Sequence, residues 1–266
     1  MIEPAPILSF DQVSKRFDGL SVIDDLSFTV RRNTRTALIG PNGAGKTTVF
    51  NLISGVYPLT SGTIKLDGEA IDDVPSRQRI RRGIARNFQN IRLMPHLSAI
   101  ENVMIGQHSR GRGLANVLQP ISMMPGNRWR QAARDALAQS GLSQYEKALV
   151  GSLPYGVQKR IELVRALQAE PKLLLLDEPA AGLNLAEKDE LRALIDDIIA
   201  TGDRTLFVVE HDMQFIGALC ETVIVLNFGC KIAEGTPEEV RSNPLVQEAY
   251  LGKAAEAPAK ELGHAS

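Results

Sequence analysis

Short apolar runs alternate along the chain with segments whose apolar residues recur at helical spacing. Runs of strand length occur at Thr36–Ile39, Lys172–Leu176 and Thr205–Val209. The first run ends in a glycine-rich loop, and a helix is expected directly after that loop, at Lys46–Ser54. Strands that alternate with helices are typical of parallel sheets covered by helices. We therefore predict an α/β fold with a mostly parallel core sheet.

Two regions depart from this alternation. Near the N-terminus, short runs at Ile7–Val13, Leu26–Val30 and Thr63–Leu66 predict partly exposed antiparallel strands. Residues 98–169 are dominated by helical patterns and predict a separate helical lobe. We expect one domain at 7–252, made of a core at 7–97 and 170–240, a helical subdomain at 98–169 and a C-terminal helix at 241–252, and a disordered tail at 253–266.

Composition and charge narrow the class of protein. The 266 residues are 44% apolar and 23% charged, with a net charge of −1 and a pI near 6.5. This is ordinary globular composition, so we expect no nucleic-acid partner. A local basic run is interpreted as a solvated helix face rather than a polyanion site. Its members are Arg77, Arg79, Arg81, Arg82 and Arg86.

The cysteines and the apolar runs indicate the compartment. Cys220 and Cys230 are read as reduced thiols, and residues 1–10 have no signal-peptide pattern, so a cytosolic protein is expected. The longest apolar runs, Leu173–Leu176 and Thr222–Leu226, are far shorter than the roughly 20 residues that span a bilayer. Any work at a membrane would need the helices of a partner.

The sharpest motif follows the first apolar strand: Gly40-Pro41-Asn42-Gly43-Ala44-Gly45-Lys46-Thr47-Thr48. It matches the phosphate-binding pattern G-x-x-x-x-G-K-[ST] between a strand and a helix. Its glycines let backbone N–H groups surround phosphates, and the helix N-terminus adds its dipole. We expect Lys46 to neutralise the β- and γ-phosphates and the Thr47 hydroxyl to bind Mg²⁺. The motif predicts an ATP site in a P-loop NTPase fold.

Two further strands end in polar residues. Leu173–Leu176 precedes Asp177 and Glu178, and Val208–Val209 precedes Glu210 and His211. In α/β sheets the carboxyl ends of parallel strands form the ligand edge, so these side chains should meet the phosphate loop. Asp177 would hold Mg²⁺ mainly through water, and Glu178 would orient the attacking water. His211 would donate a hydrogen bond to the γ-phosphate.

These residues, with Gln89 and the loop Leu153-Pro154-Tyr155-Gly156-Val157-Gln158, resemble an ATP-binding cassette ATPase over Ile7 to about Gly252. The resemblance makes Gln89 the loop glutamine that senses Mg²⁺ and relays to a membrane partner. It makes Phe17 the aromatic residue that stacks on adenine. It makes Leu153–Gln158 the signature, which acts on the ATP of the opposite subunit. Ala181–Asn184 would couple the two subunits, with Asn184 where many relatives have Asp.

Within this family, several stretches are similar to the ATPases of branched-chain amino-acid importers: Ile39–Asn51, Arg86–Leu93, Asp177–Asn184, Gly235–Val240 and Ala249–Gly252. The resemblance implies an ATP-hydrolysing subunit at the cytoplasmic face of the inner membrane. Its partners would be a second, unlike ATPase subunit, two permease subunits and, indirectly, a periplasmic substrate-binding protein. Open alternatives are urea or amide import, lipopolysaccharide export, a non-transport ABC ATPase and a regulatory module without turnover.

The signature departs from the family pattern. Pro154 stands where the family has Ser, and Val157 stands where it has Gln. Proline has neither hydroxyl nor N–H to donate to a phosphate, although its fixed φ suits the first turn of a helix. A harmless variant is one interpretation. Our hypothesis is that two unlike subunits form two unlike sites, and that Pro154 caps the weaker one.

Apolar side chains after Gln89 are candidates for a groove that receives a permease helix, with packing in the helical lobe as the alternative: Ile91, Leu93, Met94 and Leu97. The long connection Gly106–Trp129 resembles the longer of the two ATPases that such importers pair. Met123, Met124 and Trp129 within it would contact lipid or a partner, or fill a small apolar cluster.

Overall fold

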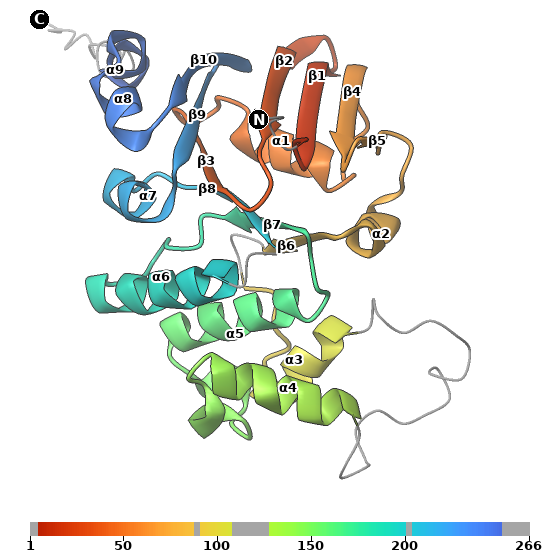
Figure 1. Ribbon diagram of the computed structural model, residues 1–266, viewed down its shortest axis with the longest axis vertical. Coiled ribbons are helices and arrows are strands. Elements are labelled where there is room, and N and C mark those ends of the chain that lie inside the picture. Colours follow the sequence, from red (N-terminus) through yellow and green to blue (C-terminus); the bar gives the residue numbers. More distant parts are fainter. Residues whose placement is uncertain (1–4, 88–90, 108–127, 201–203, 252–266) are drawn as a thin grey trace, which may run out of the picture.

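The computed structural model describes residues 5–87, 91–107, 128–200 and 204–251 (Figure 1). The core strands are β3 (Arg35–Ile39), β6 (Ile84–Asn87), β7 (Leu173–Asp177), β8 (Thr205–Val209), β9 (Thr222–Asn227) and β10 (Cys230–Gly235). They form one sheet in the order β10-β9-β3-β8-β7-β6. All neighbours pair in parallel except β10, which is antiparallel to β9. The prediction of a mostly parallel core sheet is confirmed.

A second sheet contains the N-terminal strands, in the order β2-β1-β4-β5, and all of its pairs are antiparallel. Its strands are β1 (Leu8–Phe17), β2 (Leu20–Val30), β4 (Ser61–Leu66) and β5 (Glu69–Ala70). The first two are longer than the sequence pattern indicated. Register shifts interrupt the β1–β2 pairing, and Gln12 has a positive φ of 49°. Such irregularities break the alternation on which the prediction depends.

The two faces of the core sheet pack against different layers. On β8, Phe207 and Val209 join a cluster with the antiparallel sheet and α1 (Lys46–Ile53). Leu206 and Val208 join the opposite cluster, which includes α5 (Tyr155–Leu167), α6 (Leu185–Ala200) and α7 (Met213–Leu219). The side chains alternate with period two, and both faces are buried. This explains why the core strands are continuous apolar runs.

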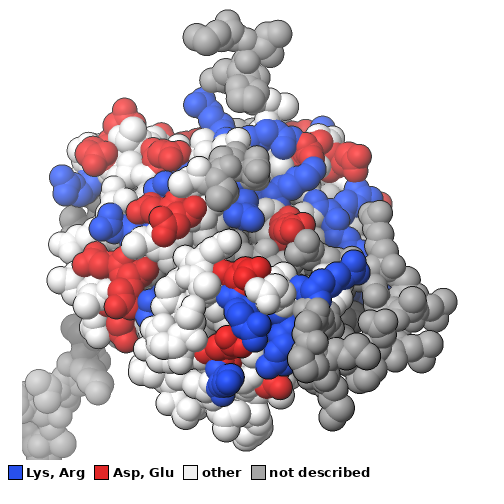
Figure 2. Space-filling model, turned by 60° about the horizontal axis from the view of Figure 1, so that its bottom comes forward, with Lys and Arg blue, Asp and Glu red and all other residues white. Residues whose placement is uncertain are grey.

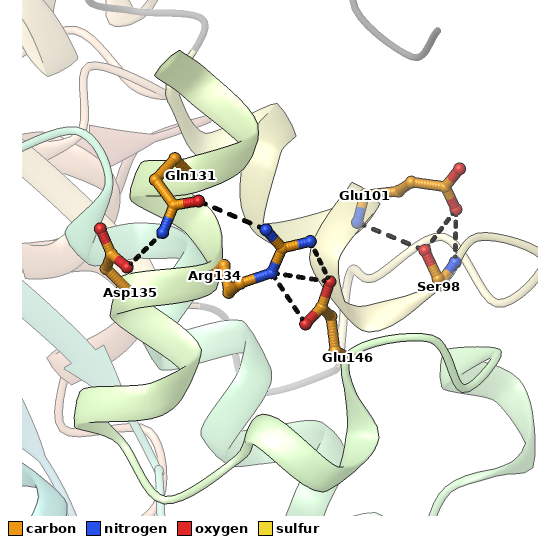
Figure 3. Close-up of polar contacts among 6 residues, drawn as sticks. All are labelled: Ser98, Glu101, Gln131, Arg134, Asp135 and Glu146. Atoms are coloured by element: carbon orange, nitrogen blue, oxygen red, sulfur yellow. Dashed lines mark hydrogen bonds and ion pairs between the residues drawn. The ribbon is translucent and has the colours of Figure 1, made fainter. Parts of the chain in front are cut away.

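The helical lobe comprises α3 (Ala99–Gly106), α4 (Arg128–Gln139) and α5 on one side of the molecule (Figure 1). Ser98 and Glu101 form a capping box at the start of α3 (Figure 3). The guanidinium of Arg134 on α4 contacts Glu146 at 2.8 Å, which lowers the pKa of that carboxyl through the hydrogen bond. The Arg134–Glu146 pair connects α4 to the segment that precedes α5.

The face on which the helical lobe lies carries both acidic and basic side chains, interspersed rather than segregated (Figure 2). Among the described residues, none of the helices combines the length and apolarity needed to cross a bilayer.

Two short helices follow β10 at the C-terminus, α8 (Pro237–Ser242) and α9 (Pro244–Leu251). The sequence predicted one helix at 241–252 instead. Proline disfavours helical conformation in the residue before it, and Asn243 has an extended ψ of 123° before Pro244. The predicted tail at 253–266 and the segment 108–127, with Met123 and Met124, lie outside the described residues.

The interpretation of the arginine run as a solvated helix face is wrong for two of its members. Arg79, at the end of α2 (Ser76–Arg79), is 4% exposed and donates to the carbonyls of Leu52 and Ile53 at the end of α1. Arg86 lies on β6 with a side chain only 7% exposed. Burial lowers the pKa of Arg79. Both arginines therefore have partners inside the fold, and neither belongs to a solvated face.

Candidate functional site

Strand order gathers the predicted site loops. β3, β8, β7 and β6 are consecutive neighbours and run parallel, so their carboxyl ends share one edge of the sheet. The phosphate loop follows β3, His211 follows β8, and Glu178 follows β7. Gln89, two residues beyond β6, lies outside the described residues. This edge is the place where α/β folds bind ligands.

The phosphate loop wraps the N-terminus of α1. Gly45 is the N-cap with a φ of 103°, and a Cβ there would lie 2.6 Å from the side chain of Ile23. Only glycine fits this turn. The Lys46 ammonium lies within the loop and donates to the carbonyls of Gly40 and Pro41 at 2.7 and 2.9 Å. The arrangement presents backbone N–H groups and a cation at one helix end, which suits phosphate.

The remaining members of the predicted loop are placed around this turn. Pro41 and Ala44 are buried, whereas Asn42, Gly43 and the first threonine of α1, Thr47, are exposed. An exposed hydroxyl at the first turn of the helix is available to a ligand at the loop. Thr48, one residue later, is half-buried.

Asp177 and Glu178 have different environments. Asp177, the last residue of β7, is 6% exposed and pairs with Arg86 through Oδ2 at 2.7 Å. Glu178 has a positive φ of 49°, and its N–H donates to the Val209 carbonyl. The Glu178 carboxylate meets His211 Nε2 at 2.8 Å. The structure therefore brings together the acid and the histidine that the sequence placed on separate strands.

A buried glutamate supports the histidine loop. Glu210 is 3% exposed and accepts the N–H groups of Ala180 and His211 at 2.7 and 2.9 Å. Burial raises the pKa of this carboxyl. Next to it, Asp212 caps α7 and pairs with Lys188 of α6 at 2.6 Å. The sequence analysis did not predict that Glu210 and Asp212 support the histidine loop. The position of Glu210 directly after a fully apolar strand could have indicated its role.

Phe17 ends β1 at the rim of the antiparallel sheet. Its ring meets Tyr57 edge-on at 5.0 Å, and the Lys15 ammonium lies 4.6 Å from the ring centroid. Lys15 pairs with Ile23, which contacts the loop at Gly45. Phe17 is two residues beyond Lys15, or about 7 Å along the strand, so it lies close to the point where this sheet meets the phosphate loop. Nothing described joins its ring directly to the loop.

The signature lies at the start of α5. Pro154 is the N-cap of this helix, one residue before its first turn, with no side-chain cap. Gln158 closes the turn, since its N–H donates to the Pro154 carbonyl and its amide to Leu153. Tyr155 is 43% exposed, whereas Val157 is 6% exposed and packs in the core.

The signature touches the loop before α6. A Cβ at Gly156 would lie 2.6 Å from the Glu187 carboxylate, and one at Gly182 would lie 3.2 Å from the Tyr155 ring. Glu187 and Asn184 form two reciprocal hydrogen bonds at the start of α6. The N–H of Asn184 donates to the Glu187 carboxylate, and the N–H of Glu187 donates to the Asn184 side-chain oxygen, both at 3.0 Å. Asn184 is therefore a helix cap, a role that Asp fills equally well.

The residues present fit a magnesium ion held largely by a nucleotide. No group of three or more His, Cys, Asp or Glu side chains among the described residues is arranged to hold a metal. Thr47 and Asp177 supply hydroxyl and carboxylate oxygens at the same edge of the sheet. Mg²⁺ prefers such oxygen donors and usually relies on few protein ligands together with substrate phosphates.

The apolar residues after Gln89 divide into two groups. Leu93 is 9% exposed and Ile91 packs against the core, so these two side chains belong to the lobe interior. Met94 is 51% exposed, and Leu97 is half-buried. Trp129 also packs against the core, and its carbonyl accepts a hydrogen bond from the Gln107 side-chain amide.

Comparison with known proteins identifies the relatives. A family model described as "ABC transporter" matches residues 23–181, and one described as "Branched-chain amino acid ATP-binding cassette transporter" matches residues 230–256. The chain is 39% identical to the high-affinity branched-chain amino acid transport ATP-binding protein BraF of Pseudomonas aeruginosa, covering 94% of this chain and 99% of BraF. It is 37% identical to the high-affinity branched-chain amino acid transport ATP-binding protein LivG of Escherichia coli, covering 94% of this chain and 99% of LivG.

A solved structure has the same fold. It is described as the ADP conformation of an ATP-binding cassette of an ABC transporter. Its TM-score is 0.83 at 28% identity, and the match covers 94% of this chain and all of that one.

Proposed function

Because this chain belongs to the ABC transporter family of ATP-binding cassettes, we propose that it is the ATP-hydrolysing subunit of an importer for branched-chain amino acids. The contact that carries the motor function is the 2.8 Å approach of His211 to Glu178 at the sheet edge that bears the phosphate loop. The cargo class is supported by the C-terminal family match at 230–256 and by the names of the relatives.

The phosphate loop binds the nucleotide. Backbone N–H groups of Gly43 to Thr47 surround the β-phosphate at the N-terminus of α1, and Lys46 turns its ammonium from loop carbonyls to the phosphates. Phe17 stacks on the adenine. Thr47, Asp177 and Gln89 are the residues that would hold Mg²⁺, Asp177 through water. Bound there, the ion would supply positive charge to the phosphate oxygens.

Glu178 and His211 act on the attacking water and the γ-phosphate. When the Glu178 carboxylate is ionised it can only accept, so His211 donates its Nε2–H to it. This contact fixes the direction of the carboxylate, which then accepts a proton from water held in line with the γ-phosphate. With ATP bound at this edge, the His211 Nε2–H would donate to a γ-phosphate oxygen. Positioning of this kind is the main contribution an enzyme makes to phosphoryl transfer.

A second ATPase subunit completes the site. The exposed start of α5 with Pro154 and Tyr155 faces outward to cap ATP on the partner, and the partner's signature caps ATP on this chain. Since Pro154 offers no hydroxyl or N–H, the site capped by this chain is the weaker of two unlike sites. The pair sits at the cytoplasmic face of the membrane on two permease subunits, which receive amino acids from a periplasmic binding protein.

The test uses the chain assembled with its partner ATPase, permease and binding protein in proteoliposomes. Mg²⁺-dependent phosphate release should rise when leucine, isoleucine or valine loads the binding protein, and Glu178→Gln should abolish it. Stimulation by urea or an amide alone would overturn the cargo assignment but not the proposed ATPase activity. Absence of Mg²⁺-dependent hydrolysis in the intact assembly would overturn the motor itself.

A further inference from the structure

Arg86 forms a buried ion pair with the carboxylate expected to hold the metal. Its Nη2 lies 2.7 Å from Asp177 Oδ2, and each side chain is 7% exposed. Moving two charges out of water is costly unless the geometry is good and further hydrogen bonds complete it. The partners lie 91 residues apart, on the adjacent strands β6 and β7. The fold therefore carries the cost of burying two charges at the edge of the site.

The second terminal nitrogen of the guanidinium, Nη1, binds the helix that follows the phosphate loop. Nη1 donates to Asn51 Oδ1 at 2.8 Å and to Ser54 Oγ at 3.2 Å, both on or at the end of α1. The guanidinium also lies 5.5 Å from the ring centroid of Phe50. Arg86 therefore joins β6, β7 and α1, the three elements that lead to the metal carboxylate and the phosphate loop.

We propose that Arg86 is a positioning residue for the metal site: it holds the Asp177 carboxylate in the orientation that receives the hydrated Mg²⁺ of a bound nucleotide. This inference rests on the proposed function, because it assumes a metal–nucleotide complex at this edge. Hydrogen-bond partners of ligating carboxylates orient them, and losing such a partner typically weakens metal binding by about 10–100-fold.

The rival role is competition, in which Arg86 occupies the place that the metal needs. A competitor must leave when metal arrives, so its removal would strengthen metal binding. The structure favours positioning, because Asn51 and Ser54 hold the guanidinium through Nη1, while Nη2 is left to bind Asp177. Its contact with Asp177 is also made to one oxygen, Oδ2. The two roles predict opposite changes in metal affinity when Arg86 is replaced.

The experiment measures metal affinity without turnover. The full chain is loaded with ADP, and Mn²⁺ binding to the complex is titrated by electron paramagnetic resonance. Arg86→Met should weaken Mn²⁺ binding by ~10-fold or more, while ADP affinity measured in EDTA stays at the wild-type value. Arg86→Lys should recover part of the loss, because it keeps the charge but not the two-armed donor. Arg82→Met is the matched control, since Arg82 pairs with Glu69 on the surface with 44% and 73% of the side chains exposed.

A double variant separates positioning from general damage. If Arg86 acts through Asp177, then Arg86→Met with Asp177→Asn should bind Mn²⁺ no more weakly than Asp177→Asn alone. The double variant should also melt above Arg86→Met, because the single change leaves a buried carboxylate without its cation. Unchanged or tighter Mn²⁺ binding in Arg86→Met, or additive losses in the double variant, would overturn the inference. If wild-type chain binds no metal–nucleotide complex, the proposed function fails instead.

Discussion

Pro154→Ser is the change that separates the structural and functional roles of the unusual signature. Pro154 is the N-cap of α5 with φ −53° and ψ 148°, values that serine adopts without strain. The hydrogen bond from Gln158 N–H to the residue 154 carbonyl involves only the backbone and is kept. The substitution therefore adds a hydroxyl and an N–H at the start of the helix and removes a ring.

The effect on stability is the difference of two small terms. A serine N-cap stabilises a helix by about 1 kcal/mol relative to a residue that cannot cap. Loss of proline costs about 0.4–1 kcal/mol, because the unfolded chain regains conformational freedom. The terms nearly cancel, so the melting temperature of the isolated chain should change by no more than about 2–4 °C.

The effect in the assembled complex is larger. One new hydrogen bond to a charged phosphate is worth about 1.5–3 kcal/mol, or roughly 10–100-fold in nucleotide affinity at the site that Pro154 caps. Pro154→Ala is the matched control, because it restores the N–H but supplies no hydroxyl. It should recover less than serine does.

The assay is vanadate trapping of nucleotide in the complex, together with phosphate release. Pro154→Ser should raise the number of nucleotides trapped per dimer and increase turnover, while melting of the isolated chain stays near the wild-type value. If trapping and turnover are unchanged in a complex of normal stability, the idea of a weakened second site is refuted. If the melting temperature moves by far more than the cap and proline terms allow, the placement of Pro154 at the N-cap is refuted.

Three other perturbations test particular contacts. His211→Ala removes the 2.8 Å contact with Glu178 and should lower kcat by about 10–100-fold with little change in ATP affinity; an unchanged kcat would remove His211 from the mechanism. Arg79→Ala removes the guanidinium that donates to the Leu52, Ile53 and Val74 carbonyls and should destabilise the chain by about 2–4 kcal/mol in denaturant melts, whereas exposed Arg77→Ala should be neutral. Burial raises the pKa of Glu162, so the stability that its protonated form contributes is lost as pH rises from the ordinary value of 4.5 through the raised pKa. Wild type should therefore lose stability relative to Glu162→Gln as the pH rises above 4.5, and a pH-independent difference would contradict this.

The sequence was most informative where chemistry and backbone are local. The phosphate loop is contiguous, and its glycines, lysine and threonine fit the turn between β3 and α1. The meeting of Glu178 and His211 followed from a general rule, because the carboxyl ends of parallel strands share an edge. Neither inference required knowledge of a particular contact between distant residues.

Sequence reasoning failed where a side chain's destination depends on distant packing. Arg86 and Asp177 are 91 residues apart, and nothing around Arg86 in the sequence shows that β6 lies beside β7. Arg79 reaches back to the end of α1 in the same way, so a basic run of ordinary appearance conceals two buried structural cations. The sequence predicted Pro154 in the first turn of the helix, whereas it is the N-cap, one residue earlier. Helix ends are difficult to predict to the exact residue.

The central claim is that the phosphate loop, Glu178 and His211 act on one nucleotide. A structure of the assembled complex carrying Glu178→Gln, with ATP and Mg²⁺ bound, tests it most directly. The account predicts the γ-phosphate within about 3 Å of the Lys46 ammonium and His211 Nε2, with the residue 178 side chain at the in-line water position. A γ-phosphate bound beyond hydrogen-bond reach of Lys46 and His211, or residue 178 directed away from it, would contradict the account.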